Sequence, residues 1–339
     1  MNALIFAAGR GERLRPFTDK IAKPAIPFLN VPMMGYPIFY LEKAGVKNFI
    51  FNTHHLPATI ESSARQLCGK RAGVLFSPEQ PEILGSGGGL AKAVSVYPQL
   101  AKDDLLIANA DMVALYENPQ VVTDLLRRHR ESGALATLLV CPFPNAKESF
   151  GGVYADTQGQ VRRFSKTALT DPNLKPWHFA GFMVVSPLAW QGLSTQPSNL
   201  FYDIFQKKID QGGKVIVLTV PATAWYETGN LKDYLASTEA ALKLLATPSP
   251  TQRTLIQILD RFTPGWWKGW RTMGEKSDSY LLCSLPWPDR IKVTGFAVVG
   301  PQALLGSQVH VNRSVISGEV TLKDSAEVQH DLILSSANA

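Results

Sequence analysis

Short apolar runs alternate with amphipathic stretches of helical length over about the first 245 of the 339 residues in this chain. The apolar runs are expected to be buried strands, and they cover residues 2–8, 48–53, 73–77, 104–109 and 134–141. The intervening stretches have a helical period and cover residues 33–44, 57–67, 88–97 and 119–131. Because such alternation is typical of parallel strands joined by helices, the pattern predicts an α/β fold with a Rossmann-like mixed sheet in which most strands are parallel.

Beyond residue 150 the expected strands become shorter, and helices are expected at residues 200–211 and 231–245. The short strands are expected at residues 152–155, 161–164, 181–186 and 214–220. This half of the domain is therefore expected to extend the edge of the sheet as α+β structure.

The last part of the chain contains a repeat with a period of six residues. Apolar or small residues recur at Val299, Leu305 and Val311, and again at Val320, Ala326 and Leu332. This period predicts a parallel β-helix, in which each six-residue side of a triangular coil points one residue inward. We therefore expect an α/β domain at 1–245, a Pro/Trp-rich connector at 246–295 and a short left-handed β-helix at 296–339.

The charge and cysteine content exclude several classes of protein. The 34 Lys and Arg residues exceed the 28 Asp and Glu residues by only six, and no run of four basic residues occurs, so nucleic acid is not an expected partner. The cysteines Cys68, Cys141 and Cys283 are far apart, so neither disulfides nor a zinc site are expected. Without a signal peptide or a membrane-spanning run, we expect a cytoplasmic protein with no membrane partner.

The first expected strand leads directly into a glycine-rich loop at residues 7–11, Ala-Ala-Gly-Arg-Gly. Glycines at this place let backbone N–H groups close around phosphate oxygens, where a side chain would block the approach. The dinucleotide motif GxGxxG does not fit, because Leu14 stands at its third glycine, and no Gly-Lys-Ser/Thr of a Walker loop follows. Arg13 offers a planar guanidinium that can donate two hydrogen bonds to one phosphate, and Lys23 offers a compact positive charge. Both groups suit the binding of a triphosphate.

This loop resembles the signature of the sugar-1-phosphate nucleotidyltransferases, or nucleotide-sugar pyrophosphorylases. Further segments resemble the family in the same order: 80–89 (QPEILGSGGG), 109–112 (NADM), 150–153 (FGGV) and 225–230 (WYETGN). The resemblance implies a GT-A-like nucleotidyltransferase domain, in a family where a hexapeptide tail recurs. The implied reaction is transfer of a nucleotidyl group from a nucleoside triphosphate to a sugar 1-phosphate, with release of pyrophosphate.

The resemblance also implies a role for individual residues. Arg13 and Lys23 are expected to be catalytic, and Asp111 and Glu227 to bind Mg2+, the expected cofactor. The expected nucleotide-binding residues are Ala8, Gly9, Gly11, Gln80, Gly85, Ser86 and Asn109. The expected sugar-binding residues are Gly151, Lys166 and Gly181.

Several positions depart from the family pattern. Ala22 replaces a proline, Ala110 replaces a glycine and Glu227 replaces an aspartate. Phe179 stands where many members have an asparagine that contacts the sugar. These departures leave open a catalytically silent paralogue that regulates another protein or senses sugar nucleotides.

The substrates are expected to be a nucleoside triphosphate and a sugar 1-phosphate. The arrangement, including the tail, resembles mannose-1-phosphate guanylyltransferases, so GTP with mannose 1-phosphate or a similar sugar is the first expectation. The glycine run at 87–89 also resembles N-acetylmuramate 1-phosphate uridylyltransferases, so a uridylyltransferase acting on that or another sugar 1-phosphate is the alternative. A homo-oligomer formed through the tail or connector is expected.

Overall fold

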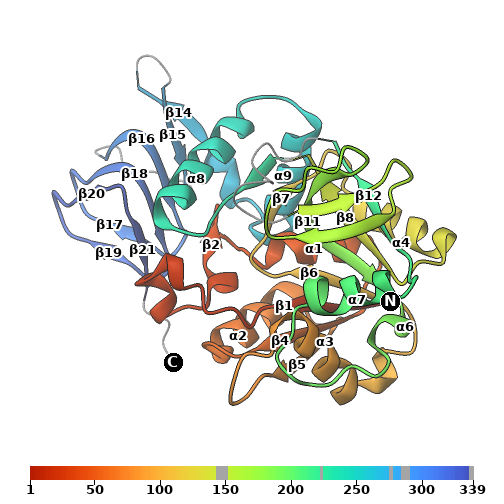
Figure 1. Cartoon of the computed structure of the whole chain (residues 1–339). Coiled ribbons are helices and arrows are strands. Elements are labelled where there is room, and N and C mark those ends of the chain that lie inside the picture. The colour runs from red at the N-terminus through yellow and green to blue at the C-terminus, as the bar shows by residue number, and fades with distance from the viewer. Residues whose placement is uncertain (143–151, 222–223, 275–277, 284–290, 336–339) are drawn as a thin grey trace. The chain divides into compact units, whose positions relative to one another are not determined.

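The computed structural model describes residues 1–142, 152–221, 224–274, 278–283 and 291–335. The chain forms two compact units, and neither is a continuous stretch of sequence. The first unit contains residues 1–9 and 37–224, and the second contains residues 10–36 and 225–339. Figure 1 traces this path from the N-terminus in red to the C-terminus in blue.

The first unit is built on a mixed nine-stranded sheet. Its strands are β1 (Asn2–Phe6), β4 (Asn48–Thr53), β5 (Gly73–Pro78), β6 (Leu105–Asn109), β8 (Ala136–Cys141), β9 (Gly152–Ala155), β10 (Val161–Ser165), β11 (Lys175–Val185) and β12 (Val215–Thr219). The strands β6, β1, β4 and β5 are neighbours and parallel, as are β8 and β12. Strand β11 is antiparallel to β6, β8 and β9. The predicted α/β fold with a mixed sheet is confirmed.

Helices alternate with these strands. They are α1 (Gly35–Lys43), α2 (Pro57–Cys68), α3 (Gly85–Val96), α4 (Val121–Ser132), α6 (Pro187–Trp190) and α7 (Gln206–Asp210), with a π-helical turn η5 (Leu200–Phe205) and a short strand β7 (Val113–Leu115). In α2 the buried residues Ile60, Ala64 and Leu67 recur at helical spacing, and the helix packs on β5. Helix α3 begins at Gly85, slightly before its predicted start at residue 88.

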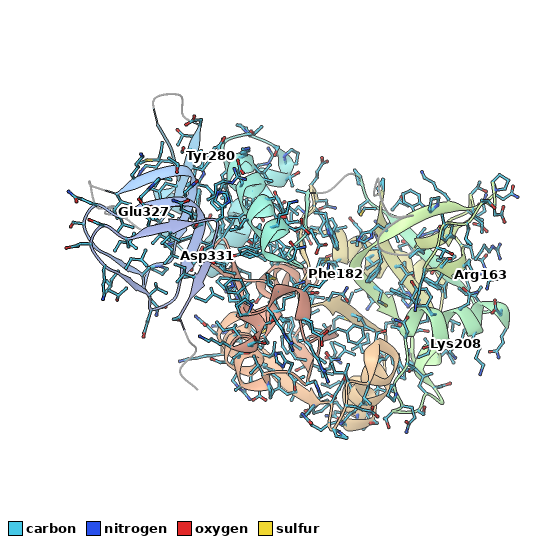
Figure 2. All side chains as sticks on the ribbon, turned by 60° about the vertical axis from the view of Figure 1, so that its left-hand side comes forward. Arg163, Phe182, Lys208, Tyr280, Glu327 and Asp331 are labelled. Carbon is cyan, nitrogen blue, oxygen red and sulfur yellow. The ribbon has the colours of Figure 1, made fainter. Side chains whose placement is uncertain are left out.

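The core of the first unit holds the central strands rigidly. Phe182 on β11 is fully buried, and its ring centroid lies 5.8 Å from that of Tyr40 and 6.2 Å from that of Tyr116. Figure 2 labels Phe182 among the side chains of this unit. Leu4 and Ile107, on β1 and β6, are also fully buried. The loops that leave the carboxyl ends of these strands therefore start from fixed positions.

Strand β11 is longer than its predicted range of 181–186, because it begins at Lys175. Gly181 interrupts its pairing: the register against β8 shifts between Phe179 and Met183, and Gly181 has a φ of 81°. A left-handed glycine within a strand is typical of a β-bulge. In the sequence a glycine is typical of a strand boundary. The predicted strand therefore starts at Gly181, whereas β11 starts at Lys175.

The second unit contains a hairpin, two helices and the tail. The hairpin consists of β2 (Pro27–Phe28) and β3 (Val31–Pro32), and the short strand β13 (Ala224–Tyr226) precedes helices α8 (Leu231–Leu245) and α9 (Pro250–Phe262). The tail strands are β14 (Arg271–Met273), β15 (Ser279–Leu282), β16 (Lys292–Val299), β17 (Leu304–Leu305), β18 (His310–Ser317), β19 (Thr321–Leu322), β20 (Glu327–Gln329) and β21 (Leu332–Leu334). Helix α9 was not expected within the Pro/Trp-rich segment.

From β15 onward the tail strands pair in parallel at nearly constant sequence offsets, whereas β14 is antiparallel to β15. Lys292 pairs with His310, and Val315 pairs with Leu332. Each of these steps along the chain corresponds closely to one full turn of a triangular coil with six-residue sides. Of the six predicted inward positions, Val299, Leu305, Val311, Val320 and Ala326 belong to one apolar cluster, and Leu332 is buried. The left-handed β-helix itself and the predicted domain limits at 245 and 295 stay predictions.

Candidate active site

Gly11 and Lys23 lie together in the glycine-rich segment of the second unit. Gly11 has a φ of 65°, and a Cβ added to it would lie 2.9 Å from Thr18 Cγ2 and 3.0 Å from Lys23 Cβ. The Thr18 hydroxyl donates a hydrogen bond to the Gly11 carbonyl (O···O 3.1 Å). A side chain at position 11 would therefore require both a strained backbone and a displacement of Lys23.

Lys23 itself begins a short 3-10 turn, Lys23–Ala25. The residue before it, Ala22, is fully buried and has a φ of −58°. This value is close to the one that a proline ring imposes. The backbone geometry expected of the family's proline is thus present at Ala22 without the ring.

Arg13 and Glu227 form an ion pair within the second unit. Arg13 Nη2 lies 3.7 Å from Glu227 Oε1, and the side chains are 67% and 29% exposed. Glu227 Oε1 also accepts a hydrogen bond from the Gly229 N–H (N···O 2.8 Å). A Cβ on Gly229 would lie 2.6 Å from Arg13 Nη2, so glycine here leaves the space that the guanidinium fills. The sequence indicates no role for Gly229 other than its place in the family segment 225–230.

Asp111 follows the carboxyl end of β6 in the first unit, beside the loop that follows β1. Phe6 and Asn109 are register partners in β1 and β6, and the Ala110 N–H donates to the Phe6 carbonyl (N···O 3.0 Å). Ala110 is fully buried and does not have a positive φ, so this position does not require glycine. The alanine therefore leaves the backbone that presents Asp111 intact.

Ala8 and Gly9 occupy the loop that follows β1. Ala8 is buried, whereas Gly9 is exposed, and a Cβ on Gly9 would have no atom within 4 Å. Gly9 therefore lies in open space, where a ligand could approach its backbone.

The segment with Gln80, Gly85 and Ser86 follows β5. Gln80 is exposed, and Gly85 begins α3 with a φ of 66°. The Ser86 hydroxyl accepts a hydrogen bond from the Leu200 N–H (N···O 2.9 Å). The Ser86 hydroxyl thus holds the start of η5 as an acceptor, while its own O–H and the Ser86 backbone stay available for the expected nucleotide role.

The expected sugar-binding residues lie in different places. Gly181 is buried against the side chain of Met112, the residue that follows Asp111. Lys166 is exposed after β10, with its Nζ 5.1 Å from the centroid of the Tyr202 ring. Gly151 lies outside the described residues. The structure therefore brings Gly181 into contact with the segment after β6, whereas it places Lys166 against Tyr202.

Phe179 packs its ring edge-on against Phe201, with centroids 5.0 Å apart. Phe201 in turn stacks on Phe164 at 5.1 Å. The position where many family members carry an asparagine is therefore part of an aromatic cluster. An apolar surface replaces a hydrogen-bonding group there.

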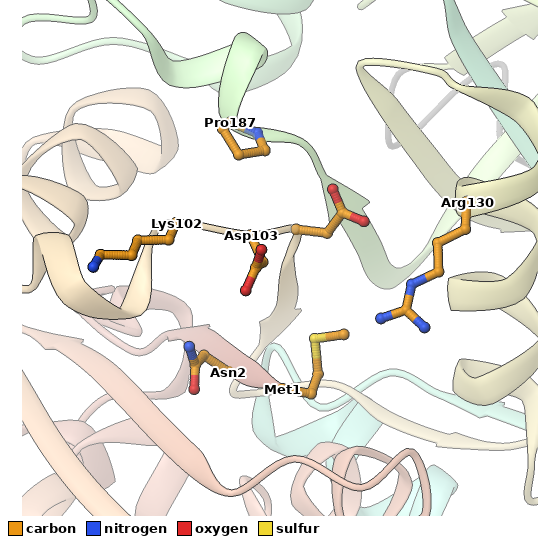
Figure 3. Close-up of a pocket in the computed structure, with 7 residues that line it drawn as sticks. Met1, Asn2, Lys102, Asp103, Arg130 and Pro187 are labelled. Atoms are coloured by element: carbon orange, nitrogen blue, oxygen red, sulfur yellow. The ribbon is translucent and has the colours of Figure 1, made fainter.

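A cavity of about 550 Å³ lies at the opposite, amino ends of β1 and β6. Its lining residues are Met1, Asn2, Lys102, Asp103, Asp104, Arg130 and Pro187. Figure 3 shows charged side chains of both signs around it. Of the expected site residues that the structure describes, none lines this cavity.

Metal clusters and membrane-spanning helices are both absent from the part of the chain that the structure describes. No group of three or more His, Cys, Asp or Glu residues there could hold a metal ion. No helix there is long and apolar enough to cross a membrane.

The comparison with known families decides the assignment. The Nucleotidyl transferase family model matches residues 2–243, well over half of the chain. The chain belongs to the Nucleotidyl transferase family. The matched range contains every expected site residue from Ala8 to Glu227, and it ends within α8, before the tail.

Several curated relatives are similar to this chain. A UTP–glucose-1-phosphate uridylyltransferase of Synechocystis sp. is 27% identical over 334 residues, which are 93% of this chain and 82% of the relative. A mannose-1-phosphate guanylyltransferase catalytic subunit beta of Xenopus tropicalis is 27% identical over 242 residues, which are 69% of this chain and 63% of the relative. Among solved structures, a UDP-glucose pyrophosphorylase from Acinetobacter baumanii has a TM-score of 0.62 at 18% identity and covers 76% of this chain and 98% of its own. That likeness concerns the fold.

Proposed function

We propose that this chain transfers a nucleotidyl group from a nucleoside triphosphate to a sugar 1-phosphate, giving a nucleotide sugar and pyrophosphate. The contact between Arg13 and Glu227 carries the proposal, because it joins two family segments from opposite ends of the matched range 2–243. Membership of the Nucleotidyl transferase family supports it independently.

The proposed reaction is an in-line attack on the α-phosphorus. A phosphate oxygen of the sugar 1-phosphate forms the new P–O bond, and the bond to pyrophosphate breaks. Such a reaction needs positioning and neutralisation of charge rather than a covalent intermediate. We assign Lys23 to the α-phosphoryl group and the sugar phosphate, and Arg13 to the leaving phosphates. The ion pair of Arg13 is exposed and is worth about 1 kcal/mol or less, so the guanidinium can turn to a phosphate.

The binding groups are assigned to three sets. We propose that phosphates are contacted by the backbone of Ala8, Gly9 and Gly11. The nucleoside is proposed to be contacted by the side chain or backbone of four residues, Gln80, Gly85, Ser86 and Asn109. Gly181, Lys166 and Gly151 are proposed to contact the sugar phosphate. The open space at Gly9 supports backbone approach at that position.

Mg2+ is the proposed cofactor, with Asp111 and Glu227 as its protein ligands. The chemistry of the donors fits, because both residues offer carboxylate oxygens, which Mg2+ prefers. Mg2+ keeps several waters and takes other ligands from substrate phosphates, so it needs no cluster of three protein ligands among the described residues. When bound, the ion neutralises charge on the triphosphate.

Two substrate pairs are candidates. GTP with mannose 1-phosphate or a similar sugar is favoured by the guanylyltransferases of Xenopus tropicalis and rice, which align over 69% and 74% of this chain. A uridylyltransferase, acting on a sugar 1-phosphate such as glucose 1-phosphate or N-acetylmuramate 1-phosphate, is favoured by the Synechocystis relative. That alignment covers 93% of the chain and so must include part of the tail.

The tail is proposed to be a left-handed β-helix, which the parallel pairing of β16 with β18 and of β18 with β21 supports. We further propose that the tail or connector mediates homo-oligomer formation. A cytoplasmic location is supported by the three cysteines of the sequence, which all lie in the described part of the chain, are buried and form no disulfide: Cys68, Cys141 and Cys283.

The test is pyrophosphate release from GTP, UTP, CTP and dTTP, each with Mg2+ and several sugar 1-phosphates. At least one pair is expected to react, and Lys23→Ala is expected to lower kcat about 10²–10³-fold, as loss of one preorganised donor does. Lys20→Ala is the matched control, because Lys20 is an exposed lysine in the same segment. Tight nucleotide binding without turnover of any pair would instead indicate a silent, sugar-nucleotide-sensing paralogue.

A further inference from the structure

Two polar side chains are buried at the carboxyl ends of β4 and β5. Asn52, near the end of β4, is 3% exposed, and Glu79, just after β5, is fully buried. We propose that Asn52 and Glu79 are positioning residues that hold two nucleotide-binding loops, residues 7–9 and 84–86, in one fixed arrangement. The inference rests on the proposed function, which assigns those loops to the nucleotide.

A chain of hydrogen bonds joins the two loops through this pair. The Ala7 N–H donates to Asn52 Oδ1 (N···O 2.6 Å), and Asn52 Nδ2 donates to Glu79 Oε1 (N···O 2.7 Å). Glu79 Oε2 accepts a hydrogen bond from the Leu84 N–H (N···O 2.7 Å). The loop after β1 is therefore tied to the first turn of α3, in the part of the unit where Figure 1 shows β1, β4, β5 and α3 close together.

The direction of each hydrogen bond is determined by the chemistry of the groups. Both oxygens of Glu79 accept, which is the pattern of an ionised carboxylate. Asn52 must present its oxygen to Ala7 and its amide nitrogen to Glu79, because Ala7 offers only a donor there. A buried charge is tolerated only where such partners are present, so the whole chain of bonds is needed to keep Glu79 in place.

The main chain of Glu79 is held as well. Its N–H donates to the Thr53 carbonyl (N···O 2.7 Å), and its own carbonyl lies 2.7 Å from His54 Nδ1. The segment that leads to Gln80 is therefore fixed to the end of β4 by its backbone and by its side chain.

The last glycine of the run 87–89 makes room for this pair. A Cβ on Gly89 would lie 2.6 Å from Glu79 Oε1 and 3.0 Å from Asn52 Nδ2. The first glycine of the run has another role, since a Cβ on Gly87 would lie 2.6 Å from Ser198 Oγ. The glycine run is thus explained by side-chain packing behind the loops and not only by the approach of a phosphate.

The consequence for catalysis concerns binding more than chemistry. Loops that bind the nucleotide stabilise the substrate complex and the transition state equally. Loss of their fixed arrangement therefore raises KM while kcat changes little. A residue that only stabilises the fold would lower the melting temperature and leave KM unchanged.

Two single variants and their combination test this chain of hydrogen bonds. Asn52→Asp places a carboxylate against that of Glu79, and Glu79→Gln places an amide donor against another donor. In the double variant N52D/E79Q the new aspartate accepts from the Ala7 N–H and from the new glutamine amide. The glutamine oxygen then accepts from the Leu84 N–H, so all the hydrogen bonds are restored with the charge moved to the neighbouring residue.

The measurement is steady-state kinetics with the nucleotide that the unmodified protein uses best. Each single variant is expected to raise KM for the nucleotide about tenfold, since a buried group loses its partner, with kcat within about threefold. The double variant is expected to return KM to within about threefold of the unmodified value. Thr137→Val is the control: it removes a buried hydrogen bond to His129 near the amino end of β8, so it lowers the melting temperature without changing KM.

The outcomes separate this inference from the proposed function. An unmodified protein that turns over its substrates, with unchanged KM in both single variants, would overturn the inference and leave the proposed function intact. Raised KM in the single variants without recovery in the double variant would also overturn it, because loss of the hydrogen bonds through Asn52 and Glu79 would then not be the cause of the raised KM. If the unmodified protein neither binds nor turns over any of the four nucleotides, the proposed function fails first and the inference fails with it.

Discussion

Gly229 determines where the guanidinium of Arg13 can lie. A Cβ at this position would lie closest to Glu227 Oε1, and it would approach Arg13 Nη2 to 2.6 Å and Cζ to 2.7 Å, while Gly229 itself does not have a positive φ. The backbone therefore accepts an alanine, and the side-chain ends of Glu227 and Arg13 have to move instead. We include this glycine in the proposed site because of the space it leaves for Arg13 and Glu227, which the residue types alone do not show.

Gly229→Ala is expected to lower kcat at least tenfold, because it displaces both Arg13, proposed to contact the leaving phosphates, and Glu227, proposed to bind Mg2+, and one preorganised donor alone is worth about 2–4 kcal/mol. The melting temperature is expected to stay within about 3 °C of the unmodified protein, since no backbone strain arises. Pyrophosphate release and thermal unfolding measure the two effects. Normal kcat in a folded variant would show that Arg13 does not need this position.

His178 makes folding stability depend on pH. Burial lowers the pKa of His178 to about 4, compared with an ordinary value of 6.5. Between these values the unfolded chain binds a proton that the folded chain does not, so stability is complete above pH 6.5 and falls as the pH decreases toward 4. Between pH 7 and pH 5 the loss from this residue is about 2 kcal/mol.

The variant His178→Gln is expected to show a smaller loss of unfolding free energy between pH 7 and pH 5, by about 2 kcal/mol, in urea titrations at the two pH values. Burial also lowers the pKa of His129, and this residue is present in both proteins, so its contribution cancels. An equal loss in both proteins would contradict the assignment to His178.

The sequence indicates some of the residues of the proposed site and gives no sign of others, for a physical reason. Arg13 and Glu227 are visible because a cation and an acid stand in short glycine-containing segments. The role of Asn52 and Glu79 cannot be recognised in the sequence, because a single polar residue at the end of an apolar strand has no local pattern that indicates its hydrogen-bond partner. Their role arises from the parallel pairing of β1, β4 and β5, which brings three strand ends together.

At the scale of elements, the parallel strands of the first unit follow their predicted ranges closely, because each is an apolar run bounded by turn residues. Helix α9 was missed, because the prolines and tryptophans around it conceal its pattern. Its buried residues Leu255, Ile258 and Leu259 have helical spacing. Ser249 caps its first turn by accepting a hydrogen bond from the Gln252 N–H (N···O 3.0 Å).

Removal of that cap is expected to destabilise the protein. Ser249→Ala is expected to reduce the free energy of unfolding by about 1 kcal/mol, the usual effect of losing an N-cap side chain. Urea denaturation measures this, and kcat is expected to stay unchanged because α9 contributes no proposed site residue. A variant as stable as the unmodified protein would mean that the cap does not form.

At the scale of the whole molecule, the segment 10–36 belongs to the same compact unit as the tail. The Ser317 hydroxyl lies 3.1 Å from Asn30 Oδ1, in the hairpin that follows the Lys23 segment. The Tyr234 hydroxyl on α8 donates to the Pro27 carbonyl in the same hairpin. Local patterns in the sequence could not predict this association, because most of the first unit, the stretch 37–224, separates the two parts along the chain.

Deletion of residues 291–339 is therefore expected to impair both stability and activity. It removes Ser317 from Asn30 and Val299 from Trp266, whose Nε1–H donates to the Val299 carbonyl. We expect a lower melting temperature and at least a tenfold loss of kcat, since the segment with Arg13 and Lys23 loses part of its support. Full activity and stability after the deletion would show that the tail is an independent module.

The fate of the phosphates tests the central claim most directly. The protein is incubated with Mg2+, a reactive sugar 1-phosphate and a nucleotide that carries 32P either at the α- or at the γ-phosphate. Nucleotidyl transfer predicts that the α-label enters the nucleotide sugar and that the γ-label leaves as pyrophosphate. Release of the γ-label as inorganic phosphate, with the α-label retained in a nucleoside diphosphate, would contradict the account.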